Sequence, residues 1–251
     1  MTKNIWITGA SSGIGKQLAI KFAKEGWQVA ASARRVNLLD DLNKNNPNIH
    51  SFPLDVVDPK NTLNTFQSIL EKLNNIDLCI FSTGTYDPKK EREINLEQIR
   101  TTINVNFFGT LNCIKVVEKY FKDKKNGHIS IISSVAGYRG LPNSTGYGPS
   151  KAALTNLAES LYFDFKKHGV RVSLISPGFI KTPMTDKNKF KMPFIKSSEF
   201  AANKIYKGLI NSKAFEITFP KQLTVIMKIL RIIPYWKYLY LIEKLTKLQK
   251  N

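Results

Sequence analysis

Short runs of β-branched and other apolar residues alternate along the chain with longer segments in which apolar positions recur every three to four residues. Seven runs have the length and composition of buried strands: residues 4–8, 28–33, 49–54, 78–81, 128–133, 170–176 and 215–219. Helical periodicity covers residues 13–25, 38–45, 62–73, 103–120, 147–167 and 199–210. This alternation predicts an α/β fold in which a doubly wound, parallel, seven-stranded sheet carries helices on both faces.

Two segments depart from the alternation. Residues 179–198 follow the end of a strand, are rich in lysine and contain Pro183 and Pro193, which predicts a long loop or short-helix lid over a substrate. Residues 221–251 form a tail of helical character. No repeat, low-complexity stretch or linker divides the chain, so we expect a single domain over residues 1–220 followed by the tail.

The tail combines apolar, aromatic and cationic residues, and Pro234 divides it into two short helices. Neither piece reaches the about 20 uninterrupted apolar residues that spanning a bilayer requires. Basic amphipathic helices that carry tyrosines and Trp236 suit the headgroup region of an anionic membrane, which would make the protein peripheral at the inner face of the membrane. Packing on the chain's own domain or across a dimer interface is an equal alternative.

The chain is strongly basic, with 38 lysine and arginine residues, 19 acidic residues and a net charge of +19. From Lys181 onward, fifteen cations face four acids, so much of the excess lies in the last 71 residues. The charge alone would suggest that the protein binds nucleic acid. No basic stretch interleaved with aromatic residues supports such binding, so we expect no nucleic-acid partner. Two distant cysteines and three isolated histidines predict neither a disulfide nor a metal site. No signal-peptide pattern precedes the first strand, so we expect a cytoplasmic protein.

A glycine-rich turn follows the first predicted strand directly and opens into a helix. Its sequence is Thr8-Gly9-Ala10-Ser11-Ser12-Gly13-Ile14-Gly15. Glycines at such a turn let backbone N–H groups approach a pyrophosphate, which is typical of a Rossmann-type dinucleotide site. A tight strand-to-helix turn without a ligand is the alternative. We expect the cofactor to contact Gly9, Ser11, Ser12, Gly13, Ile14 and Gly15.

The end of the second strand indicates which dinucleotide binds. Where an NAD site usually has an acidic residue, this chain has Ala33 followed by Arg34 and Arg35. A guanidinium can pair with a 2′-phosphate through two hydrogen bonds, so NADP(H) is favoured over NAD(H). A solvated charge at a helix start is the alternative. Asp55, with Val56 beside it after the third strand, is placed to reach the adenine.

Tyr147 and Lys151 are four residues apart on a predicted helix, so they project from one face of it. A phenol has a pKa near 10, and a neighbouring ammonium is expected to lower that pKa toward the neutral range. A strand ending in Ser133 and Ser134 lies upstream of the pair. A surface pair is the usual meaning of this spacing, but its combination with a dinucleotide turn favours an acid/base site.

In this combination the chain resembles the short-chain dehydrogenase/reductase family, over roughly residues 3–219. The resemblance implies that Ser134 holds the substrate oxygen, that Tyr147 is the acid/base, and that Lys151 assists it and binds the nicotinamide ribose. It further implies that Asn106 holds a water in the proton relay. The resemblance adds four cofactor contacts: Gly84, Pro177, Gly178 and Thr182.

Two departures from the family pattern affect these expectations. Where the family usually has Asn-Asn-Ala-Gly, this chain has Phe81-Ser82-Thr83-Gly84, from which we expect altered packing rather than lost activity. Pro149 lies between Tyr147 and Lys151, and it is tolerated only if it falls in the first helical turn.

The resemblance implies an NADP(H)-dependent oxidoreductase that reduces a ketone or aldehyde, or oxidises the corresponding alcohol. The apolar character of residues 179–198 and of Tyr138, Leu141 and Pro142 predicts a hydrophobic or lipid-like substrate. We expect a homo-oligomer, a dimer or tetramer. A catalytically silent NADP(H)-binding sensor or scaffold is the alternative, although such a protein would normally lack one of the three residues Ser134, Tyr147 and Lys151.

Overall fold

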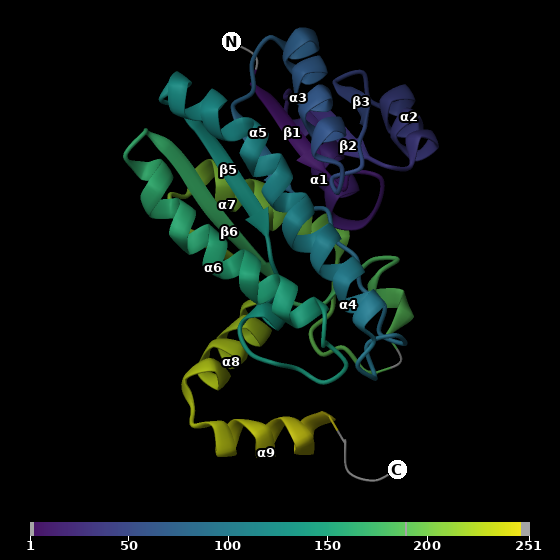
Figure 1. Ribbon diagram of the computed structural model, residues 1–251, viewed down its shortest axis with the longest axis vertical. Helices are drawn as coiled ribbons and strands as arrows, with labels where there is room; N and C mark the ends of the chain where they lie inside the picture. Colours follow the sequence, from purple (N-terminus) through teal and green to yellow (C-terminus); the bar gives the residue numbers. More distant parts are fainter. Residues whose placement is uncertain (1–2, 189, 247–251) are drawn as a thin grey trace.

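Alternate residues of the first strand point to opposite sides of the sheet, and each side meets its own layer of helices. The computed structural model describes residues 3–188 and 190–246 and confirms the predicted Rossmann-type α/β architecture (Figure 1). The seven parallel strands are β1 (Asn4–Thr8), β2 (Gln28–Ala33), β3 (Ile49–Pro53), β4 (Leu78–Phe81), β5 (Gly127–Ile132), β6 (Val170–Pro177) and β9 (Glu216–Phe219). Their order in the sheet is β3-β2-β1-β4-β5-β6-β9. Each lies within about a residue of its predicted position.

The helices cover both faces of this sheet. Those in the two cores are α1 (Gly13–Lys24), α2 (Val36–Asn45), α3 (Pro59–Leu73), α5 (Gly109–Lys124), α6 (Tyr147–Lys166) and α7 (Ser198–Asn211). The described residues also form α4 (Leu96–Ile103), α8 (Lys221–Ile232) and α9 (Tyr235–Thr246), and α9 lies away from the sheet (Figure 1). Ile5 and Ile7 of β1 pack in one core with α1, α2 and α7, whereas Trp6 packs in a second core with α3, α5 and α6. This alternation buries both faces, as a parallel sheet requires.

The expectation of a single helix over residues 103–120 is wrong in its extent. Helix α4 begins earlier, at Leu96, where the side chain of Asn95 accepts the N–H of Gln98. A π-helical turn, η1 (Asn104–Phe108), then joins α4 to α5, so the three elements form one long rod (Figure 1). Such a turn inserts a residue into the helical repeat and changes which side chains face inward. Here it buries Asn106.

The prediction of a long loop or short-helix lid over residues 179–198 is incomplete, because the segment also contains two short strands. Two-residue strands, β7 (Ile180–Lys181) and β8 (Lys196–Ser197), pair in parallel and tie the two ends of the segment together. A short 3-10 turn, η3 (Thr185–Lys187), lies between them. Lys189 lies outside the described residues.

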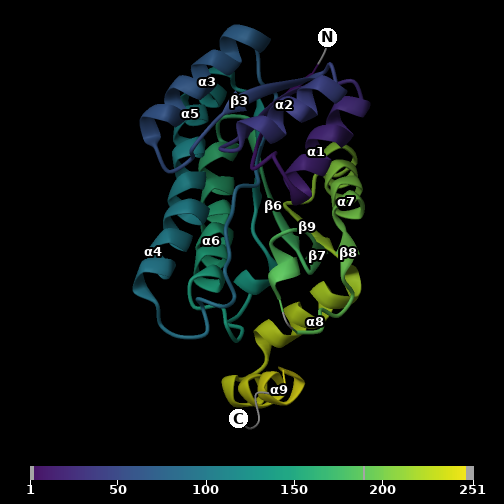
Figure 2. The same ribbon diagram turned by 90° about the vertical axis from the view of Figure 1, so that its right-hand side faces the viewer.

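The tail forms two helices, as predicted, and Pro234 separates them. Its inward side chains build a third core with residues that follow β5. Figure 2 shows α8 below the end of the sheet and α9 beyond it. The members of this third core are Val135, Tyr138, Leu223, Met227, Leu230, Tyr238 and Ile242. Over residues 3–188 and 190–246, no helix is both long and apolar enough to cross a membrane. The predicted tail also includes residues 247–251, which lie outside the described part of the chain.

Candidate active site

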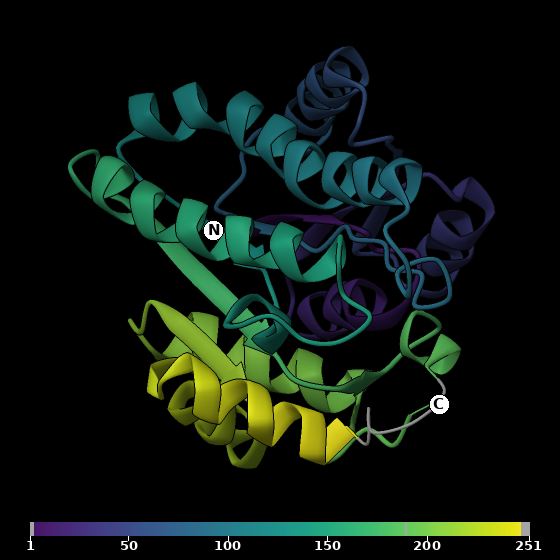
Figure 3. The ribbon, with the colours of Figure 1, turned by 60° about the horizontal axis from the view of Figure 1, so that its bottom comes forward.

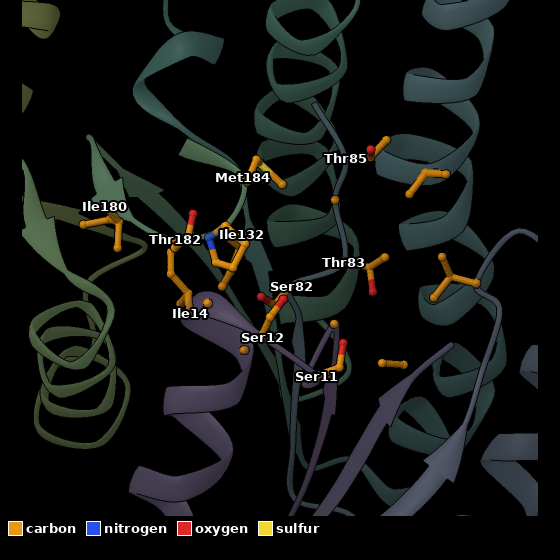
Figure 4. A pocket seen from close by; sticks show the side chains of 18 of the residues that line it. Ser11, Ser12, Ile14, Ser82, Thr83, Thr85, Ile132, Ile180, Thr182 and Met184 are labelled. Atoms are coloured by element: carbon orange, nitrogen blue, oxygen red, sulfur yellow. The ribbon is translucent and has the colours of Figure 1, made fainter. Parts of the chain in front are cut away.

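A cleft of about 310 Å³ opens at the carboxyl edge of the sheet, where the strand order changes direction between β1 and β4. Open α/β sheets bind ligands at this switch point, because loops from neighbouring strands diverge there. Figure 4 shows Ser11 and Ser12 beside the start of α1, and Thr83 and Thr85 on the loop that follows β4. Of the predicted site residues, the cleft is lined by Gly9, Ser11, Ser12, Gly13, Ile14, Gly15, Arg34, Arg35, Asp55, Val56, Gly84, Ser134, Tyr147, Lys151, Pro177, Gly178 and Thr182.

Two glycines of the turn, Gly9 and Gly15, occupy positions that have no room for a side chain. A Cβ on Gly15 would lie 2.3 Å from the carbonyl oxygen of Gly9, so only glycine lets α1 start against the turn. Gly9 itself has a φ of +68°, and a Cβ there would lie 2.9 Å from the oxygen of Ser82. Ser12 precedes α1 without a side-chain cap, so the first N–H groups of the helix are left for a ligand. The turn therefore fits the pyrophosphate of a dinucleotide.

Arg35 lies against this turn. Its Nη2 donates to Oγ of Ser11 at 2.8 Å and to Oγ of Ser12 at 2.7 Å, and its Nε lies 3.2 Å from Ser11 Oγ. The guanidinium is thus oriented toward the glycine turn, while its exposed neighbour Arg34 lines the same cleft. Two cations and two hydroxyls in this place suit an anionic group.

Asp55 shapes the adjoining wall of the cleft. One of its carboxylate oxygens accepts the N–H of Val57 at 3.1 Å, and its own N–H donates to the side chain of Asn61 at 2.8 Å. These bonds fix the turn after β3. The predicted contact of Asp55 with adenine stays a prediction.

Helix α6 begins at Tyr147, so Pro149 falls in its first turn and leaves the helix intact, as expected. Lys151 follows one turn later, and its Nζ lies 5.6 Å from the centroid of the Tyr147 ring. The lysine is only 4% exposed. Its Nζ donates to the carbonyl oxygen of Ile132 at the end of β5, at 2.9 Å. The predicted pair thus faces the cleft from one side of α6.

The expected lowering of the Tyr147 pKa is not found. Burial raises the pKa of Tyr147 to about 12, because removal from water disfavours the charged phenolate. Interaction with Ser134 acts in the opposite direction, and the negative charge of Glu91 raises the pKa further. Burial also lowers the pKa of Lys151 to about 8. The phenol is therefore held protonated at neutral pH.

The two serines at the end of β5 have different surroundings. The hydroxyl of Ser133 is buried, where it donates to the carbonyl oxygen of Lys151 at 2.7 Å and bonds the hydroxyl of Thr155 at 2.9 Å. Ser134 lines the cleft, and its Oγ accepts the N–H of Ala136 at 3.1 Å. Ser133 therefore holds α6 against β5, and Ser134 is the serine available to a ligand.

Asn106 is fully buried in the π-helical turn and does not line the cleft. Its Oδ1 accepts the N–H of Thr85 at 2.7 Å, and its Nδ2 donates to Thr85 O at 3.1 Å and to Ser150 Oγ at 3.0 Å. The side chain thus joins the loop after β4 to α6. Its predicted role in holding a water stays a prediction.

Glu91 is a site residue that the sequence did not indicate. It is 1% exposed, and its Oε2 accepts the backbone N–H groups of Gly146 and Tyr147, each at 3.0 Å. A carboxylate at this position neutralises the positive end of α6 and fixes the start of the helix that carries Tyr147. In sequence, Glu91 belongs to an ordinary charged run of residues 89–93, so no local signal distinguishes it.

The predicted pocket residues Tyr138, Leu141 and Pro142 do not line the cleft. Tyr138 instead donates its hydroxyl to the carboxylate of Glu216, and both Tyr138 and Leu141 pack against the tail in the third core. The tail covers this side of the loop and removes it from the cleft. The wall on the substrate side comes from the segment after β6, with Ile180, Thr182, Pro183, Met184 and Thr185.

A glycine turn at the switch point of a parallel sheet defines the class: an α/β protein built to bind a dinucleotide. Residues 3–192 match the family described as short chain dehydrogenase. An uncharacterized oxidoreductase of Myxococcus xanthus is 33% identical over 232 residues, which cover 91% of each chain. The 3-oxoacyl-acyl-carrier-protein reductase FabG of Thermotoga maritima is 32% identical over 185 residues, covering 72% of this chain and 75% of that one.

Among solved structures, ElxO with NADP bound is similar, with 26% identity and a TM-score of 0.75 over 87% of this chain and 98% of its own. The chain therefore belongs to the short-chain dehydrogenase/reductase family of oxidoreductases. These relatives and the geometry of the turn together support a nicotinamide dinucleotide as the cofactor.

Proposed function

We propose that this protein is an NADP(H)-dependent oxidoreductase that reduces a ketone or aldehyde, or oxidises the corresponding alcohol. The observation that carries the proposal is the convergence of Ser134, Tyr147 and Lys151 on one cleft that also contains the glycine turn. A scaffold protein would have no need for a buried lysine beside a phenol that lines the cleft, since burying an ionisable group costs stability.

The preference for NADP(H) rests on the basic end of the cleft. The guanidinium of Arg35 donates hydrogen bonds to the hydroxyls of Ser11 and Ser12. A bound 2′-phosphate would accept hydrogen bonds from the same guanidinium, in place of these hydroxyls or together with them. No acidic side chain lies at the end of β2, where an NAD site would hold the ribose hydroxyls. ElxO, which is 26% identical, binds NADP.

The reaction follows from the positions of three side chains. The hydroxyl of Ser134 donates a hydrogen bond to the substrate carbonyl oxygen and orients it toward Tyr147. Bound nicotinamide supplies the hydride for reduction, or accepts it in oxidation. Tyr147 gives its phenolic proton to the oxygen as negative charge develops there. The ammonium of Lys151, 5.6 Å from the ring, then stabilises the phenolate.

The raised pKa of Tyr147 favours the reductive direction. A phenol with a pKa of about 12 is protonated at neutral pH, so the proton that carbonyl reduction consumes is in place, whereas the phenolate that alcohol oxidation needs is scarce. We therefore propose reduction of a carbonyl as the direction for which the residues of this site are arranged. Ile180 and Met184 in the wall of the cleft favour an apolar group beside that carbonyl.

The test is NADPH consumption with a panel of ketones, aldehydes and 3-oxoacyl thioesters, with NADH in parallel. We expect turnover of at least one carbonyl class, with NADPH preferred. Tyr147→Phe should bind NADPH as the parent does and lose about three orders of magnitude in kcat. Phe163→Ser, an exposed position on α6, is the matched control. If the parent binds NADPH but reduces nothing in the panel, the silent scaffold is the better interpretation.

A further inference from the structure

The tail helices have a second apolar face that the third core does not use. In α9, only Tyr238 and Ile242 are buried, so the helix touches the rest of the molecule along one narrow stripe. Figure 1 places α9 at the end of the molecule, beyond α8 and away from the sheet, and Figure 3 shows the two helices together from that end. The outward side of α8 and α9 is open to solvent.

Large apolar and aromatic side chains cover this outward side. The exposed members are Val225, Ile226, Ile229, Ile232, Tyr235, Trp236, Leu239, Tyr240, Leu241 and Leu245. Ile232 is 81% exposed and Trp236 is 69% exposed, although tryptophan is usually at least half-buried in a folded protein. We call these ten side chains the tail surface. The ring of Tyr235 also contacts the guanidinium of Arg139, which lies 4.4 Å from its centroid. So many exposed apolar side chains on two neighbouring helices mark an interaction site.

The charges around the tail surface are almost all positive. Over residues 221–246 there are five cations, namely Lys221, Lys228, Arg231, Lys237 and Lys244, and one acid, Glu243. Lys228 forms an ion pair with Glu216 of β9, at 2.5 Å, which leaves four cations outside that pair. All five cations are exposed. Lys237 and Lys244 lie on the same side of α9, next to the aromatic side chains, because they are seven residues apart. Cations beside tryptophan and tyrosine match the headgroup level of an anionic bilayer.

This charge pattern favours a membrane over a second copy of the chain as the partner of the tail surface. Outside the Lys228–Glu216 pair, two tail surfaces placed face to face would bring eight cations together against two acids, which opposes association. A bilayer that contains anionic phospholipid presents the opposite charge and an apolar interior at the depth that the outward side chains could reach. The exposed aromatic residues, which carry polar tips on apolar rings, suit that boundary as well.

Helix α8, which carries part of the tail surface on its outward side, packs with its inward side beside a residue of the cleft. Leu223 of α8 approaches Gly178 so closely that a Cβ on Gly178 would lie 2.6 Å from Leu223 Cδ2. Gly178 lines the cleft. The inward side of α8 therefore lies next to the segment after β6 that lines the cleft, while its outward side stays exposed.

We propose that α8 and α9 form an interfacial docking surface for bilayers that contain anionic phospholipid. The apolar and aromatic side chains of the tail surface enter the boundary between headgroups and acyl chains, and the surrounding lysines contact the headgroup charge. The helices lie in the plane of the membrane. This proposal concerns binding alone and does not depend on turnover.

The experiment is co-sedimentation of the full chain with vesicles of phosphatidylcholine alone and of phosphatidylcholine with 30% phosphatidylglycerol. We expect at least about tenfold stronger binding to the anionic vesicles, weakening as salt is raised. The triple variant Ile232→Ser, Trp236→Ser, Leu239→Ser, called the tail triple variant below, should lose binding to both types of vesicle. Lys237→Glu with Lys244→Glu should lose the preference for anionic lipid. These five side chains are exposed, so the fold should persist, which a circular dichroism melt checks.

The matched control is Leu63→Ser, Ile94→Ser, Phe163→Ser, three exposed apolar positions outside the tail. It should bind vesicles as the parent does, and so should Tyr147→Phe. Equal binding of parent and tail triple variant would overturn the proposal. A parent that binds neither vesicle type would also overturn it. If the mass measured by light scattering is then halved in the tail triple variant but not in the control, a second copy of the chain is the occupant of the tail surface.

Discussion

Replacing Glu91 by alanine would remove the acceptor for two backbone N–H groups at the start of α6. Both bonds, to Gly146 and to Tyr147, are 3.0 Å long and involve a charged oxygen, and Glu91 is 1% exposed. Water cannot easily replace the carboxylate in so enclosed a place. The truncation therefore leaves two donors without a partner, at the helix end that positions Tyr147.

The expected loss of stability follows from these two bonds. A buried group left without its charged partner costs about 1.5–3 kcal/mol, so Glu91→Ala should lower the free energy of unfolding by roughly 3 kcal/mol. For a domain of this size that corresponds to a fall in Tm of roughly 6–12 °C. Glu91→Gln keeps an acceptor oxygen and should lose only about 1 kcal/mol.

The charge of Glu91 also affects the titration of Tyr147. Because the carboxylate raises the pKa of the phenol, its removal should lower that pKa. In Glu91→Gln the rate of alcohol oxidation, which needs the phenolate, should therefore reach half its maximum at a lower pH than in the parent. A residue that only supported the fold would not move this pH profile.

The measurements are urea unfolding followed by circular dichroism, and the pH profile of alcohol oxidation with NADP. Glu93→Ala is the matched control, because Glu93 lies two residues away and is exposed. If Glu91→Ala unfolds within about 0.5 kcal/mol of Glu93→Ala, the capping argument is wrong. If Glu91→Gln leaves the pH profile in place, the electrostatic argument is wrong.

Three further predictions concern other parts of the molecule. Arg35→Ala should weaken NADPH binding at least about tenfold and NADH binding much less, as measured by fluorescence titration; equal losses would contradict a 2′-phosphate role. Lys151→Met should abolish turnover yet raise the free energy of unfolding at pH 7 by about 2 kcal/mol, because burial holds the folded pKa of Lys151 at about 8, below the 10.5 of the unfolded chain. The folded parent binds fewer protons than the unfolded chain between those values, so its stability rises with pH there, and the advantage of Lys151→Met should disappear by about pH 10.5; a constant advantage would exclude this cause. Tyr138→Phe should cost about 1 kcal/mol in urea unfolding through its lost bond to Glu216 and leave NADPH affinity unchanged, since Tyr138 does not line the cleft; weaker NADPH binding would contradict that placement.

The strands could be predicted closely because each is buried on both faces and reads as an apolar run with turn residues at its ends. The ends of the helices were harder to predict than the strands. Helix α3 starts at Pro59, three residues before the predicted start, because Asp58 caps it by accepting the N–H groups of Lys60 and Asn61. That Asp-Pro signal is local and could have been recognised. The start of α4 was missed although Leu96, Ile99 and Ile103 recur at helical spacing and Asn95 caps the helix, because the segment is short and mostly polar.

The candidate site divides in the same way. Residues within one motif, such as the glycine turn or the spacing of Tyr147 and Lys151, were predicted because their geometry is set by a few neighbouring residues. Glu91 acts on residues 55 and 56 positions away, and nothing near it in the sequence records that contact. The wrong placement of Tyr138 has the same origin, since its partner Glu216 lies 78 residues further on.

The contacts of the tail also determine how its role can be tested. Deleting residues 221–251 would uncover Val135 and Tyr138, which share the third core with Leu223 and Met227 and lie within four residues of Ser134. Such a deletion would disturb the candidate site along with the tail surface, so a loss of activity or of membrane binding would have two explanations. Substitutions on the outward side of α8 and α9 leave the third core intact. The predicted boundary at residue 220 therefore marks a change in sequence pattern, whereas the inward half of the tail packs as part of the domain.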